Sequence, residues 1–117
     1  MANDNARRGA YWKARSKRHL QMLGFQVFDM EIMRTVWTPC GPVCTKKDQA
    51  GSDLMYFTKS VVVFCQVKGG MKPLSTLIKD AARSFANYEF PEHSRQELHV
   101  WRPRARQPEV VAMWPTT

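Results

Sequence analysis

Apolar residues recur at spacings of three and four over residues 7–23, which predicts an amphipathic helix. Gly24 follows directly and suits the C-cap position that ends a helix. The apolar side contains Tyr11, Trp12, Leu20 and Leu23. The other side is basic and contains Arg7, Arg8, Lys13, Lys17 and Arg18. Such a helix could lie along a phosphate backbone, although simple solvation of each cation is the alternative reading.

Over residues 25–33 the side chains alternate with a period of two residues, which predicts a strand. Asp29 and Glu31 are acids within this alternating pattern. Either these acids sit at the solvated end of an edge strand, or one of them leans toward a metal position. Residues 35–49 contain prolines and a glycine, and we expect an irregular basic loop there. Residues 1–6 are mostly small and polar, and we expect them to be frayed.

Two further strands are predicted at residues 53–57 and 61–67, joined by a short turn. Residues 61–64 are all apolar, which is typical of a strand buried on both faces, in the middle of a sheet. Gly69 and Gly70 end this strand, because glycine allows a sharp turn of the backbone.

A second helix is predicted at residues 75–88, where Ser75 can cap the N-terminus. Strands follow at residues 97–102 and 109–114. The order of elements is αβββαββ, so we expect one α/β (α+β) domain spanning residues 1–117. Its centre would be a mixed β-sheet of about five strands flanked by helices.

The net charge of +8 is large for so small a domain and indicates a polyanionic partner. Nucleic acid is the commonest such partner, although the charge could serve solubility alone. The chain has no run of apolar residues long enough to cross a bilayer and no signal-like N-terminus, so we expect no membrane association and an intracellular, cytoplasmic location. Cys40, Cys44 and Cys65 then form no disulfide framework, and no second ligand pair follows to make a zinc site.

The candidate chemistry lies on the two strands that flank the short turn. If they form a hairpin, Asp53 lies beside Gln66 and Lys68, which share one face of a strand while Val67 faces the other way. An acid, a second oxygen ligand and a lysine are the minimum equipment for a hard divalent cation acting on a phosphate.

These residues resemble a known family. Asp53, then a strand with Gln66-Val67-Lys68, between a helix ending at Gly24-Phe25 and a second helix, resembles the PD-(D/E)XK nuclease fold. Within that fold the chain looks most like the small Holliday junction resolvase-like nucleases of archaea and phages. The resemblance covers residues 8–88. It implies a restriction-endonuclease-like fold and a metal-dependent endodeoxyribonuclease that resolves four-way DNA junctions in recombination or repair, in a bacterial or phage-infected host.

The resemblance also implies roles for individual residues. Asp53, the amide oxygen of Gln66 and the backbone carbonyl of Val67 would hold one or two Mg²⁺ or Mn²⁺ ions. Lys68 would orient the attacking water or stabilise charge in the transition state.

The chain departs from the family pattern at two positions. Gln66 stands where the family usually has a glutamate, and Lys13 stands where resolvase relatives supply a glutamate from the first helix. Asp48 is the first choice to replace the missing carboxylate, with Glu31 as the second.

Two symmetric cuts in a junction require two active sites in fixed relation, so the resemblance implies a homodimer. Candidate interface residues are Trp37, Phe90, Trp101 and Trp114. Candidate contacts to DNA phosphates are Arg7, Arg8, Lys13, Lys46, Lys47, Lys72, Arg102, Arg104 and Arg106. The alternatives are a branched-DNA-binding module with weakened catalysis, or a nuclease of the same fold acting on flaps or duplex DNA.

Overall fold

A computed structural model describes the backbone of residues 2–113, and describes the side chains within that range except those of residues 2–7, 32–34 and 45–48. The predicted roles of Arg7, Lys46, Lys47 and Asp48 therefore concern side chains outside the described set, and Trp114 lies outside it altogether. The elements are α1 (Ala2–Met22), β1 (Val27–Asp29), β2 (Glu31–Thr38), β3 (Gly41–Asp48), β4 (Leu54–Phe57), β5 (Val62–Gly69), α2 (Leu74–Phe85), β6 (Ser94–Trp101) and β7 (Glu109–Ala112).

The main sheet is five-stranded and mixed, with the strand order β1-β4-β5-β6-β7. β5 and β6 are parallel and are connected through α2, whereas the other neighbouring pairs are antiparallel. The predicted α+β fold with a mixed central sheet is confirmed, and β5 is the middle strand, as its apolar run predicts. The observed order of elements differs from the predicted one by two added strands, β2 and β3.

The two helices cover opposite faces of this sheet. Leu20 of α1 packs with Leu54 and Cys65 on one face, and Leu77 of α2 packs with Leu98 on the other. Each of these side chains is almost fully buried, which is worth about 1.5–3 kcal/mol for a leucine. The sheet is therefore a rigid support held from both sides.

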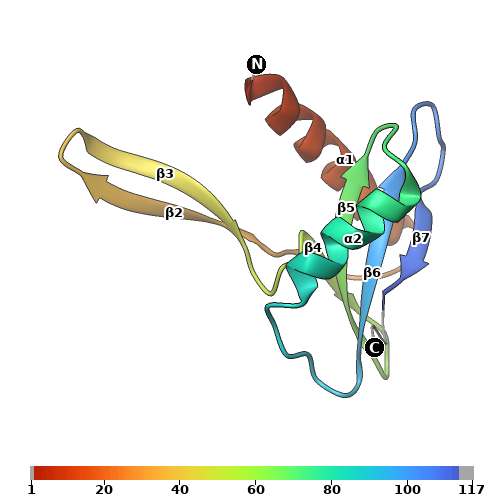
Figure 1. Ribbon diagram of the computed structural model, residues 1–117. Helices are drawn as coiled ribbons and strands as arrows, with labels where there is room; N and C mark the ends of the chain where they lie inside the picture. The colour runs from red at the N-terminus through yellow and green to blue at the C-terminus, as the bar shows by residue number, and fades with distance from the viewer. Residues whose placement is uncertain (1, 114–117) are drawn as a thin grey trace.

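The predicted irregular loop over residues 35–49 is wrong. β2 and β3 pair as an antiparallel ribbon in continuous register, from Glu31 opposite Asp48 to Thr38 opposite Gly41. The turn residues are confined to the tip, where Gly41 has a φ of 114°, and the β-branched residues beside it favour strand pairing. Figure 1 shows this ribbon extending away from the main sheet.

Three other predicted boundaries also differ. The expected single strand at residues 25–33 is divided at Met30, whose N–H donates to the carbonyl of Asp53 at 3.1 Å. α1 begins at Ala2 instead of after a frayed segment. α2 begins at Leu74 with Pro73 in the N-cap position, so Ser75 lies inside the helix and is not its cap.

Replacing Gly69 by alanine should destabilise the protein by about 1–3 kcal/mol, because the added Cβ would overlap the indole of Trp12. Gly9→Ala is the matched control, since a Cβ at Gly9 meets no atom within 4 Å and alanine favours a helix by about 1 kcal/mol. Chemical denaturation measures the free energy of unfolding of both variants. An unchanged stability of Gly69→Ala would contradict the close packing of α1 on β5.

Candidate active site

Hydrogen bonds to Cys65, Met30 and Val67 hold Asp53 in place immediately before β4. Its N–H donates to the carbonyl of Cys65 at 2.8 Å, and its own carbonyl accepts from the N–H of Met30 at 3.1 Å. Its carboxylate oxygen Oδ2 accepts from the N–H of Val67 at 2.8 Å. The carboxylate is therefore fixed between the β1–β2 junction and the segment of β5 that carries the other candidate residues.

The predicted hairpin is confirmed. β4 and β5 pair with Leu54 opposite Cys65, which brings Asp53 next to Gln66. The turn is stabilised by Thr58, whose Oγ1 accepts from the N–H groups of Ser60 and Val61 at 3.3 and 3.2 Å.

Gln66 and Lys68 occupy the same face of β5 but have different surroundings. Gln66 is only 3% exposed, and its amide nitrogen donates to the carbonyl of Gly51 in the turn before Asp53. This contact leaves the amide oxygen as the atom of Gln66 that could act as a ligand. Lys68 is half-buried, and its ammonium makes no hydrogen bond or ion pair with the described residues.

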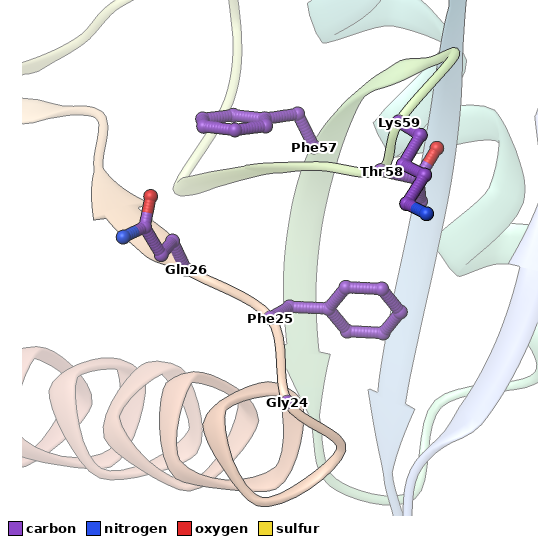
Figure 2. A pocket seen from close by; sticks show the side chains of 6 residues that line it. All are labelled: Gly24, Phe25, Gln26, Phe57, Thr58 and Lys59. Carbon is purple, nitrogen blue, oxygen red and sulfur yellow. The ribbon is translucent and has the colours of Figure 1, made fainter.

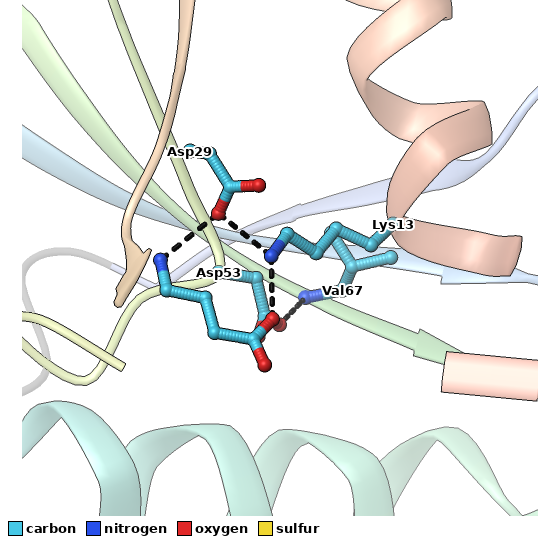
Figure 3. Close-up of polar contacts among 5 residues, drawn as sticks. Lys13, Asp29, Asp53 and Val67 are labelled. Atoms are coloured by element: carbon cyan, nitrogen blue, oxygen red, sulfur yellow. Dashed lines mark hydrogen bonds and ion pairs between the residues drawn. The ribbon is translucent and has the colours of Figure 1, made fainter. Parts of the chain in front are cut away.

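A cluster of two acids and a lysine adjoins Asp53. The ammonium of Lys13 lies 2.7 Å from Oδ1 of Asp29 and 2.6 Å from Oε2 of Glu31, and the N–H of Glu31 donates to Asp29 at 2.9 Å. Figure 3 shows Lys13 reaching from α1 to these acids, with Asp53 bonded to Val67 in the same region. The position expected to carry a helix glutamate thus carries a cation that is already paired with two carboxylates.

The close pairing changes the charge equilibria of this cluster. Burial lowers the pKa of Lys13, but the hydrogen bonds to Asp29 and Glu31 outweigh burial and hold the pKa above its ordinary value. Burial raises the pKa of Asp29, but the hydrogen bond from Lys13 outweighs it and the pKa is lowered. Both groups are therefore charged at neutral pH.

The sequence left open that Asp29 or Glu31 leans toward a metal position, but of the two only Glu31 was considered as a replacement ligand. The ion pair of Asp29 with Lys13 was not predicted. The side chain of Asp48, the first choice, is outside the described set, although its backbone lies opposite Glu31 in the ribbon.

The candidate DNA contacts divide into exposed and engaged cations. Arg8, Lys72, Arg104 and Arg106 are exposed. Lys13 has a side chain only 14% exposed, so its ammonium faces carboxylates and not solvent. Arg102 donates to the carbonyls of Gly70 and Lys72 at 3.0 and 2.7 Å, and so anchors the loop after β5.

The candidate interface residues also divide. Trp37 is 78% exposed, on the ribbon. Trp101 is only 2% exposed, and Phe90 packs against Phe64 with a centroid distance of 4.9 Å. Trp101 and Phe90 are therefore core residues of this chain, which corrects their assignment to an interface.

A second polar cluster lies between the sheet and α1. The hydroxyl of Tyr56 donates to Oε1 of Glu97 at 2.8 Å, and Nε2 of His99 lies 3.3 Å from the same oxygen. Cys65, Glu97 and His99 have ligand atoms within 4.8 Å of one another, a donor set that suits zinc better than magnesium. Burial raises the pKa of the Cys65 thiol, which disfavours the thiolate that a metal needs. The cluster therefore adds nothing to the expectation of Mg²⁺ or Mn²⁺.

A hollow lies where the chain passes from α1 to β1, beside the turn after β4. Figure 2 shows Phe25 and Phe57 among its lining residues, and Lys59 is the single cation among the described residues that line it. The ring of Phe25 packs against Tyr56 with a centroid distance of 4.7 Å, so the Gly24-Phe25 junction serves the core. This lining offers little for binding phosphate.

Comparison with the models of known protein families gives no match, and comparison with curated protein sequences gives none either. Among residues 2–113, no helix is both long enough and apolar enough to span a membrane.

Acidification should weaken the contribution of the Lys13 cluster to stability. The folded pKa of Asp29 is depressed, so its contribution is present above the unfolded pKa of about 3.9 and is lost as the pH falls through the folded value. The folded pKa of Lys13 is raised, so its contribution is present below about 10.4 and is lost only as the pH rises through the folded value.

Denaturation measured between about pH 7 and pH 2 should therefore show that the free energy of unfolding falls less with acidification in Asp29→Asn than in the unchanged protein. Asp80→Asn is the control for removal of one carboxylate, because Asp80 lies on α2, which covers the face of the sheet opposite to the helix that carries Lys13. The same acid dependence in Asp29→Asn and the unchanged protein would contradict the ion pair.

Proposed function

We propose that this protein is a metal-dependent, structure-specific endodeoxyribonuclease that cuts branched DNA, with the four-way junction as its substrate. The observation that carries this proposal is the fixed position of Asp53 beside Gln66-Val67-Lys68, with Asp29 and Glu31 alongside. Asp53 comes from the start of β4 and Gln66-Val67-Lys68 from β5, and their proximity supports the arrangement that the resemblance to the PD-(D/E)XK nucleases implies.

The donor set suits Mg²⁺ or Mn²⁺. Carboxylate oxygens of Asp53 and Glu31, the amide oxygen of Gln66 and the carbonyl of Val67 are the hard oxygen ligands that these ions prefer. The ammonium of Lys13 between two carboxylates supports a cation position at this place. A bound ion would polarise the scissile phosphate and lower the pKa of a coordinated water.

The two lysines of the site, Lys68 and Lys13, would affect its charge and the position of its acids. Lys68 has a half-buried ammonium without a partner among the described side chains, and it would stabilise the negative charge that develops on the phosphate. Lys13 holds Asp29 and Glu31 together and competes with a metal ion for their oxygens. Among the described side chains of the site, the carboxylates of Asp29, Glu31 and Asp53 outnumber the ammonium groups of Lys13 and Lys68 by one, which favours weak binding of a divalent cation.

The proposed cleavage of a DNA junction implies two partners, the DNA itself and a second copy of the chain. A net charge of +8 and the exposed Arg8, Lys72, Arg104 and Arg106 support phosphate contacts with DNA. Two cuts in one junction require a homodimer, for which the exposed Trp37 is the remaining described candidate. The reaction would take place in the cytoplasm of a bacterial or phage-infected cell.

A second function is favoured by a specific observation. Lys13 already fills the position between the acids, and the amide nitrogen of Gln66 already bonds to Gly51. Both contacts suit a module that holds branched DNA without cutting it. Flaps or duplex DNA are the alternative substrates if cleavage occurs.

Cleavage of labelled junction, flap and duplex DNA with EDTA, Mg²⁺ or Mn²⁺ tests the proposal. We expect paired nicks in the junction that need the ion and fall at least about a hundredfold in Asp53→Asn and in Lys68→Ala. Lys59→Ala, a lysine in the apolar hollow, should cut normally. Junction binding without product under any ion would assign the module, and preferred cutting of flaps or duplex would change the substrate.

Removing the charge of Lys13 tests the cation position directly. Lys13→Gln should bind Mn²⁺ about tenfold more tightly than the unchanged protein, because a competing positive charge leaves the acids. Isothermal titration calorimetry measures the affinity, with Lys79→Gln on α2 as the control for loss of one exposed lysine. Equal affinity in Lys13→Gln and the control would show that the metal position lies elsewhere.

A further inference from the structure

A groove rich in arginine runs between α1 and the connection from β6 to β7. Its lining includes Tyr11, Arg15, Arg18, Met22, Trp101 and Arg106. Every lining residue with a permanent charge is an arginine, and no acid contributes to the described lining. We call this surface the arginine groove.

The groove is built around a fixed guanidinium. Arg15 lies 4.3 Å from the ring centroid of Trp101 and donates to the carbonyl of Ala105 at 2.9 Å. Trp101 is itself locked by a hydrogen bond from Nε1 to Oγ of Ser16 at 2.6 Å. Stacking on an aromatic ring leaves the charge of Arg15 intact, and a guanidinium has further N–H donors to offer. The positive wall is therefore preorganised across two segments of the chain.

The groove lies on a different side of α1 from the candidate active site. Along an α-helix, residues 11, 15, 18 and 22 project to one side, whereas Lys13 projects to nearly the opposite side. Lys13 is bound to Asp29 and Glu31 beside β1, away from the loop that carries Arg106. A ligand in the groove would need neither the metal ion nor the residues of that site.

The lining favours an occupant with both phosphates and rings. Guanidinium groups bind phosphate oxygens in a bidentate manner, and three of them without an acid favour a polyanion. Tyr11, Met22 and Leu23 are 55%, 79% and 60% exposed, and they give an aromatic and apolar surface that a lone phosphate would leave uncovered. Single-stranded nucleic acid combines phosphates with unpaired bases that stack on aromatic rings.

We propose that the arginine groove binds single-stranded DNA, with phosphates on Arg15, Arg18 and Arg106 and a base against Tyr11. A duplex presents its bases stacked inside, so it could use only the arginines. A lipid surface is less suited, because membranes take up protruding apolar side chains and this surface is hollowed. The proposal concerns binding alone and stands independently of the nuclease function.

Fluorescence anisotropy of a labelled oligothymidylate of about 12 nucleotides tests the groove, with EDTA present so that cleavage plays no part. The double variant Arg18→Ala/Arg106→Ala should raise Kd at least about tenfold and reduce the slope of log K against log salt by about 1.4. Tyr11→Ala should raise Kd about five- to hundredfold, the value of one stacked base.

The control is the double variant Lys59→Ala/Lys79→Ala, which removes the same charge at exposed positions away from the groove. It should bind almost as the unchanged protein does. Arg18→Lys/Arg106→Lys should recover the salt slope, which separates loss of phosphate contacts from damage to the fold. Asp53→Asn should bind the single strand normally, so failure of the nuclease proposal and failure of this one give different results.

Three outcomes would overturn the proposal. The first is an equal Kd for the arginine and lysine double variants, or no binding by the unchanged protein. The second is an arginine effect with no change in Tyr11→Ala, which would describe a phosphate site without recognition of a base. The third concerns the double variant Arg18→Ala/Arg106→Ala: it binds the single strand as before but no longer binds anionic phosphatidylserine vesicles or polyglutamate. That result would assign the groove to a lipid surface or an acidic protein.

Discussion

The hydrogen bonds of Asp53 to Met30, Cys65 and Val67 are the contacts on which the candidate site depends. They join the β1–β2 junction, the start of β4 and the middle of β5, beside the strand pairing that links β1, β4 and β5 in the sheet. The carboxylate takes part by accepting from the N–H of Val67, so the residue that carries the proposed chemistry also completes the hydrogen bonding of the sheet. Structure and proposed function therefore place opposing demands on one side chain, because an oxygen held by the backbone has fewer lone pairs for a metal ion.

The ammonium of Lys13 is compatible with either proposed function, so the behaviour of this residue when a metal ion binds distinguishes the two. Desolvation opposes a partly buried charge, and here two carboxylates at hydrogen-bonding distance offset that cost. Removing one member of such a group leaves uncompensated charge, so the cluster stabilises its own geometry. An ammonium that stabilises the empty site would have to move aside, or share its ligands, when a divalent ion enters. The arginine groove carries no such conflict, since no acid contributes to its described lining.

The sequence predicted the parts of the fold that local pattern determines. The apolar run before Cys65 identified the central strand, and the helical spacings identified both helices to within a few residues. The ribbon was missed because Pro39, Gly41 and Pro42 are strong local signals for a loop, whereas the pairing of Glu31 with Asp48 depends on contacts far apart in the chain. Asp53 and Lys68 could be proposed as candidates because they follow a motif, but the meeting of Lys13 with Asp29 and the stacking of Arg15 on Trp101 arise only when α1 docks.

The base of the ribbon is narrow, since the N–H of Gln49 meets the carbonyl of Met30 at 2.8 Å. The chain thus leaves the main sheet and returns to it at nearly the same point, so a short turn could replace the ribbon at little cost in chain entropy. Asp29 is the last residue of β1 and Asp53 directly precedes β4, whereas Glu31 is the first residue of the ribbon. A change in the length of this ribbon, or in what it contacts, would therefore leave the main sheet intact while altering how many carboxylates surround Lys13. The charge of the site could thus change without a change in the fold that supports it.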